Sequence, residues 1–75
     1  MSVVTRFTSY GVMVPIVILW ENGKRYFIDS VSECRRVAGI GEESTWLRYK
    51  CRIHGEEHYL FYEGDMKWFV EAKDP

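Results

Sequence analysis

Three runs of alternating apolar and polar residues fill the C-terminal part of the chain, between Thr45 and Lys73. The runs span residues 46–53, 58–62 and 67–71. Two tight-turn signals, His54-Gly55 and Gly64-Asp65, lie in the gaps between them. A period of two, in runs rich in aromatic and β-branched residues, is typical of antiparallel strands. The pattern therefore predicts a three-stranded antiparallel meander.

The pairing of the first two runs decides which side chains share a face of the sheet. A turn at His54-Gly55 pairs Cys51 with His58, whereas a turn at Gly55-Glu56 shifts the register by two residues. Both turns leave the faces unchanged. One face then carries Leu47, Tyr49, Cys51, Ile53, Leu60 and Tyr62. The opposite face carries Arg48, Lys50, Arg52, Tyr59 and Phe61.

The orientation of the last run depends on the length of its loop. A two-residue turn at Gly64-Asp65 places Trp68 and Val70 on the face of Phe61. A three-residue loop places Phe69 on that face instead. Both alternatives remain open from the sequence.

A second hairpin is predicted in the N-terminal half, where two apolar runs flank Glu21-Asn22-Gly23. Apolar strands around Asn-Gly are a strong hairpin signal. A two-residue turn would pair Trp20 with Arg25. We favour a three-residue loop with Gly23 in the left-handed conformation, because it pairs Ile18 with Tyr26. That register gathers an apolar face of Ile16, Ile18, Trp20, Tyr26 and Ile28.

The segments around this hairpin carry weaker signals. Pro15 lacks a backbone donor, so the start of its strand is expected at a sheet edge or a bulge. Residues 1–11 are expected to be an edge strand, at Val3–Phe7, or loosely ordered. Residues 39–44 read as a loop.

Residues 31–38 are predicted to form one short helix. Ser30 followed three residues later by Glu33 matches a capping box, and Gly39 is a suitable terminator. The side chains of Val31, Cys34 and Ala38 recur at helical spacing. The alternation of Val31 with Ser32 also permits a strand that continues from Phe27.

Five to six short strands with apolar residues on both faces predict a mainly β fold, a small antiparallel meander curled on itself. The first expectation is an SH3-like or related barrel, because closure removes exposed strand edges. An open curled meander with the helix packed on it is the second. The 75 residues are expected to make one domain, since this length supports a single core.

Composition narrows the class of protein. A hydrophobic fraction of 47% and an aromatic fraction of 16% are typical of a folded domain. The net charge of −1 argues against a general binder of nucleic acid or anionic membranes. The two cysteines, the absence of a signal-peptide pattern and the short apolar runs predict a cytoplasmic protein without a membrane span.

Metal binding and catalysis have little support in the sequence. Cys51, His54 and His58 have zinc-like spacing, with Cys34 as a fourth ligand, but the strand pleat turns Cys51 inward, away from His54. Cys51 and His58 are the only thiol and base that pairing brings together, and an inward cysteine usually packs as a small apolar side chain. We therefore expect no metal, no cofactor and no enzymatic activity.

The face of Arg48, Lys50, Arg52, Tyr59 and Phe61 is the candidate binding surface. Aromatic side chains interleaved with basic ones on a sheet can stack bases and neutralise phosphates. We expect a non-catalytic interaction module for single-stranded nucleic acid or a nucleic-acid-handling protein. The alternative is a structural or protein-binding domain that uses the same face, with Trp68 beside Phe61.

The sequence also resembles a group of short uncharacterised bacterial proteins, chiefly from Gram-positive anaerobes. The resemblance covers residues 14 to 73. Its motifs are Trp20-x2-Gly23-x2-Tyr26-x-Ile28-Asp29-x-Val31, Arg48-Tyr49-x-Cys51-Arg52-Ile53, Tyr59-Leu60-Phe61 and Trp68-Phe69-Val70-Glu71. In layout the chain is more distantly similar to an actinobacterial family of unknown function, often encoded near translesion polymerase genes. The resemblance implies a small β domain with a nucleic-acid context and transfers no active-site residues.

Overall fold

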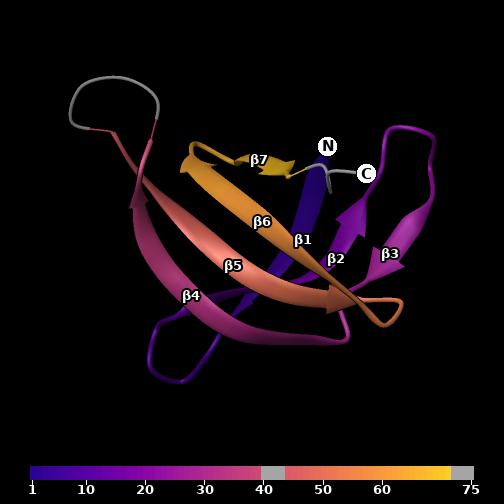
Figure 1. Ribbon diagram of the computed structural model, residues 1–75, viewed down its shortest axis with the longest axis horizontal. Coiled ribbons are helices and arrows are strands. Elements are labelled where there is room, and N and C mark those ends of the chain that lie inside the picture. Colours follow the sequence, from indigo (N-terminus) through magenta and orange to yellow (C-terminus); the bar gives the residue numbers. More distant parts are fainter. Residues whose placement is uncertain (40–43, 72–75) are drawn as a thin grey trace.

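The computed structural model of the chain describes residues 1–39 and 44–71 (Figure 1). These residues form seven strands: β1 (Ser2–Phe7), β2 (Met13–Leu19), β3 (Arg25–Phe27), β4 (Ser30–Ala38), β5 (Thr45–Ile53), β6 (Glu56–Gly64) and β7 (Lys67–Val70). The N-terminal sheet has the order β1-β2-β3, and the C-terminal sheet has the order β4-β5-β6-β7. Every pair of neighbouring strands is antiparallel. The mainly β prediction is confirmed, with one more strand than the upper expectation. The predicted 39–44 loop lies mostly outside the described residues.

The two sheets face each other and do not close into a barrel (Figure 1). On one side β1 approaches β7, but no ladder of the described residues joins these strands. On the other side the link between β3 and β4 meets β5, where the Asp29 amide donates to the Arg52 carbonyl over 2.8 Å. The expected closed barrel is therefore not found among the described residues, because no ladder joins β1 to β7 or β3 to β4.

The N-terminal hairpin has the three-residue loop that the sequence favours. The Trp20 amide donates to the Lys24 carbonyl over 2.9 Å, and the Gly23 amide donates to the Trp20 carbonyl over 3.0 Å. Gly23 has a φ of 85°, a conformation that glycine adopts without steric cost. Ile18 consequently pairs with Tyr26, as predicted.

Pro15 lies beside a bulge in the central strand of this sheet. β1 pairs Val4 with Val17 and Thr5 with Pro15, so Ile16 has no partner in β1. A bulge interrupts the ladder where proline cannot donate a hydrogen bond. This confirms the expectation for Pro15, and β1 is an edge strand as expected for Val3–Phe7.

The predicted helix at residues 31–38 is wrong, because this segment is strand β4. It pairs with β5 from Ser30 opposite Arg52 to Ala38 opposite Thr45, with Ser32 unpaired in a bulge. A helix of two turns is marginal by itself. The nine-residue strand, of which all residues but Ser32 pair with β5, satisfies the backbone groups along an edge of β5, and these bonds outweigh the local helix signals. The strand alternative holds, but β4 begins a new sheet and does not extend β3.

The two hairpins of the C-terminal sheet settle the open registers. His54 and Gly55 have φ values of 51° and 77°, and they form the turn that pairs Cys51 with His58. The next turn comprises Asp65 and Met66, between Gly64 and Lys67. An unpaired Glu63 shifts the register there, so Phe61 pairs with Phe69 and Tyr62 pairs with Trp68. Phe69, not Trp68, therefore shares the face of Phe61.

The core lies between the two sheets. Its buried side chains are Val3, Ile18, Tyr49, Cys51, Ile53, Leu60 and Trp68. Trp68 packs near Tyr62 and Tyr49, with ring centroids 4.6 and 5.8 Å away. Trp20, which the hairpin register assigned to the apolar face, is 40% exposed at the rim. The inward faces of both sheets thus make one small core.

Candidate interaction face

The outward face of the C-terminal sheet carries the predicted binding residues Arg48, Lys50, Arg52, Tyr59 and Phe61. The register places Lys50 opposite Tyr59 and Arg48 opposite Phe61. The inward neighbours Tyr49, Cys51 and Leu60 are almost completely buried. The alternation read from the sequence is therefore confirmed, and these five side chains lie on one surface, here called the outer face.

Arg48 lies at the centre of the outer face. Its guanidinium carbon is 4.8 Å from the centroid of the Tyr59 ring, within range of a cation–π contact. Its Nη2 is 3.7 Å from Oε1 of Glu33, and the same carboxylate oxygen contacts Nε of Arg35. These contacts hold the planar guanidinium against an aromatic ring.

The two other basic side chains of β5 are also engaged. Nζ of Lys50 is 3.7 Å from Oε1 of Glu57. Arg52 is the register partner of Glu57, but its Nη1 donates to the Gly55 carbonyl over 2.9 Å. A carboxylate therefore accompanies Arg48 and Lys50, and the outer face is mixed in charge.

Sequence reasoning missed an aromatic cluster on the same face, formed by Trp46, Phe61 and Phe69. The rings of Phe61 and Phe69 are stacked, with centroids 4.8 Å apart and an interplanar angle of 6°. The Trp46 ring stands edge-on to Phe69 at 5.1 Å and to Phe61 at 6.4 Å. Trp46 precedes Arg48 by two residues, so the alternation of β5 would have placed it on this face. Phe69 depended on the turn that the sequence left open.

Gly39 allows the indole of Trp46 to lie close to the backbone. A Cβ atom at residue 39 would be 2.5 Å from Nε1 of Trp46 and 2.7 Å from Cε2. Such a separation is too short for any side chain there without movement of the indole. Gly39 thus positions one wall of the aromatic cluster.

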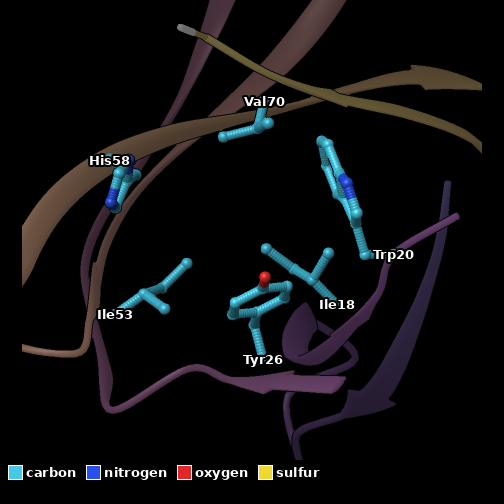
Figure 2. Close-up of a pocket in the computed structure, with 6 residues that line it drawn as sticks. All are labelled: Ile18, Trp20, Tyr26, Ile53, His58 and Val70. Atoms are coloured by element: carbon cyan, nitrogen blue, oxygen red, sulfur yellow. The ribbon is translucent and has the colours of Figure 1, made fainter. Parts of the chain in front are cut away.

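A second feature is a cavity of about 320 Å³ at the open side between the sheets. It is lined by Ile18, Trp20, Tyr26, Ile53, His58 and Val70. Figure 2 shows these side chains around one space, with Ile18 and Tyr26 facing His58 and Val70 across it. Nε2 of His58 lies 3.6 Å from Oε2 of Glu56. The lining residues are mainly apolar, and their polar groups are the indole N–H of Trp20, the phenol of Tyr26 and the imidazole of His58.

The positions of the two cysteines do not favour nucleophilic or metal-binding chemistry. Cys51 pairs with His58 in register, but burial raises the pKa of the Cys51 thiol to about 11, with a smaller contribution from Cys34. The thiol therefore stays protonated at neutral pH and is a poor nucleophile. Cys34 is exposed on β4. Within residues 1–39 and 44–71, His, Cys, Asp and Glu side chains form no group of three that could hold a metal ion.

Comparison of the chain with family models, curated proteins and solved structures finds no match. The described part of the chain also has no helix long and apolar enough to cross a membrane. The function is therefore proposed mainly from the geometry of the surface.

Proposed function

We propose that this chain is a non-catalytic interaction module that binds single-stranded nucleic acid on the outer face. The observation that carries the proposal is the aromatic cluster of Trp46, Phe61 and Phe69 beside the Arg48–Tyr59 contact. Aromatic rings on a β-sheet stack bases with little dependence on sequence, and each stacked base contributes about 1–3 kcal/mol. The distant similarity of layout to an actinobacterial family that is often encoded near translesion polymerase genes is consistent with this role, which we place in the cytoplasm.

The basic side chains supply the contacts to the phosphates. Arg48, Lys50 and Arg52 point outward at every second position of β5, so they follow one line along the strand. The pairing of Arg48 with Glu33 and of Lys50 with Glu57 lowers the net charge of the outer face, and a phosphate must compete with these carboxylates. We therefore expect weak binding that depends strongly on salt.

The test is a titration with a twelve-residue oligothymidylate, followed by backbone amide shifts. We expect shifts confined to strands β5, β6 and β7. If three phosphates are contacted, the logarithm of the binding constant should fall with the logarithm of salt with a slope of about −2. Arg48→Gln should weaken binding, because it removes the charge from the centre of the face. Arg25→Gln, which changes an exposed arginine of the N-terminal sheet, is the matched control and should bind normally. Unchanged amide signals at low salt would refute the proposal.

A second candidate is a protein partner for the same face. It is favoured by the carboxylates of Glu33 and Glu57 among the basic residues, since mixed charges with an aromatic centre are typical of protein interfaces. This alternative predicts no response to the oligonucleotide. It also predicts no salt-dependent shift of the Trp46 indole signal.

A further inference from the structure

The outward face of the N-terminal sheet carries an exposed apolar row. Val4, Val17 and Phe27 lie side by side, because β1 pairs Val4 with Val17 and β3 pairs Phe27 with Val17. Val4 is 41% exposed and Phe27 is 65% exposed. The inward neighbours Val3 and Ile18 are in the core, so the row points away from the C-terminal sheet. An apolar row in which the exposed Val4 and Phe27 flank the half-buried Val17 is a candidate interaction site.

A shallow groove follows this row. It has a volume of about 200 Å³ and is lined by Val4, Val17, Leu19, Arg25 and Phe27. A cavity of about 150 Å³ is enough to hold a benzene molecule, so the groove has room for one apolar side chain. Of the described residues, Arg25 is the single charged one that lines it. An apolar group seated there would have a guanidinium beside it.

The charged residues at the outward positions of β1, β2 and β3 are all positive. Alternation places Ser2, Arg6, Val14 and Leu19 on the same side as the row, and the register puts Arg6 beside Val14 and Arg25 beside Leu19. The row therefore has one arginine toward each end. None of these outward positions in β1, β2 and β3 is a carboxylate. The nearest carboxylates along the chain, Glu21 and Asp29, are in the links outside the strands.

The structure assigns this face to an acidic peptide segment of a partner protein. An apolar side chain of that peptide fills the groove, and flanking Asp or Glu side chains meet Arg25 and Arg6. Charge complementarity excludes a second copy of this chain, because two identical faces would oppose arginine to arginine. The row is mainly aliphatic, and aliphatic side chains do not supply the ring faces on which bases stack. This site is separate from the outer face and does not depend on the proposed function.

The test is selection of binders from a displayed library of random dodecapeptides against the whole chain. We expect the selected peptides to share an apolar residue next to Asp or Glu. A synthetic copy of one such peptide should shift the amide signals of Val4, Val17, Leu19 and Phe27. Selected peptides that are basic, or that shift only the outer face, would overturn the inference. So would a failure to enrich any peptide.

Two exposed substitutions sharpen this test. Phe27→Ser and Arg25→Glu should each weaken binding of the synthetic peptide about tenfold or more. Phe27→Ser removes an apolar anchor, and Arg25→Glu reverses the charge beside the groove. The matched controls Phe61→Ser and Arg48→Gln change the outer face and should leave peptide binding unchanged. Vesicles of phosphatidylglycerol and phosphatidylcholine should not bind. If the vesicles bind, if Arg25→Glu abolishes that binding and if the peptide shifts no amide signals, the face would be assigned to a lipid surface. The peptide proposal would then be refuted.

Discussion

The Tyr49 hydroxyl donates a hydrogen bond to the backbone carbonyl of Met13 over 2.7 Å. Tyr49 belongs to β5 and Met13 begins β2, so this bond joins the two sheets through the core. Within residues 1–39 and 44–71 it is the one side-chain hydrogen bond between the sheets. Burial also raises the pKa of Tyr49 far above its usual range, so the hydroxyl remains a donor at all ordinary pH values.

The Tyr49–Met13 bond predicts the effect of Tyr49→Phe. The variant keeps the ring but leaves the Met13 carbonyl without its donor, which should lower the free energy of unfolding by about 1–2 kcal/mol. Urea unfolding monitored by circular dichroism measures this change. The control is Tyr10→Phe, since Tyr10 is 93% exposed and its variant should unfold like the parent. Equal stability of Tyr49→Phe and the parent would mean that the bond contributes nothing.

Cys51 predicts a loss of stability at high pH. Its thiol has a pKa of about 11 in the folded chain, raised from an ordinary value of 9.0. A raised thiol pKa contributes stability in full below pH 9.0, and this contribution is lost as pH rises toward 11. Two pKa units correspond to about 2–3 kcal/mol.

Urea unfolding at several pH values between 8 and 11 measures this loss. Tyr49 contributes a fall of the same sign, because its pKa is raised as well. In the Cys51→Ala variant the free energy of unfolding should change less between pH 9 and 10 than in the parent. The Cys34→Ser variant should retain most of the parent's pH dependence. A parent protein with constant stability over this range would contradict the burial of the thiol.

Two substitutions of Trp68 are expected to differ in their effect on stability. The Nε1 atom of Trp68 is buried, and it has no hydrogen-bond partner among the described residues. An unsatisfied buried donor costs about 1–3 kcal/mol. Trp68→Phe removes that cost while losing some apolar contact, so its stability should lie near that of the parent. Trp68→Ala should lose about 3–5 kcal/mol. Thermal unfolding compares them, and a loss as large in Trp68→Phe would indicate that Nε1 has a partner.

The effects of substitutions at Gly39 and Trp46 on stability are expected to be coupled. Gly39→Ala places a Cβ atom against the Trp46 indole and should cost about 1–3 kcal/mol. In a Trp46→Ala background the same change should cost much less, since the obstructing ring is gone. The double-mutant cycle measures the difference. Additive effects would show that the two residues do not meet.

The sequence predicted the strands that alternate and failed where distant pairing decides the structure. The faces of β5 and β6, the three-residue loop before Lys24 and the bulge at Pro15 follow from local patterns of residues. The segment 31–38 has genuine helix signals, but the unpaired edge of β5 outweighs them. A local pattern contains no information about such an edge.

The candidate site shows the same division. The five residues named from alternation lie on one face. Trp68, which only one of the two open registers placed beside Phe61, is buried, and Phe69 lies there instead. The unpaired Glu63 causes the exchange, and turn residues alone do not reveal a bulge. The ion pairs of Glu33 with Arg35 and Arg48 were also not predicted from the sequence, because Glu33 belongs to the segment predicted as a helix.

The unpaired residue at Glu63 has an evolutionary consequence. Removing its codon would leave Gly64 opposite Lys67 and Tyr62 opposite Trp68, so the ladder would become regular while Trp68 stayed in the core and Phe69 stayed on the outer face. The length of the chain can therefore vary by one residue at this position without an exchange of the two faces of β7. Related chains that are one residue shorter here should carry their aromatic residues at the same positions of this strand.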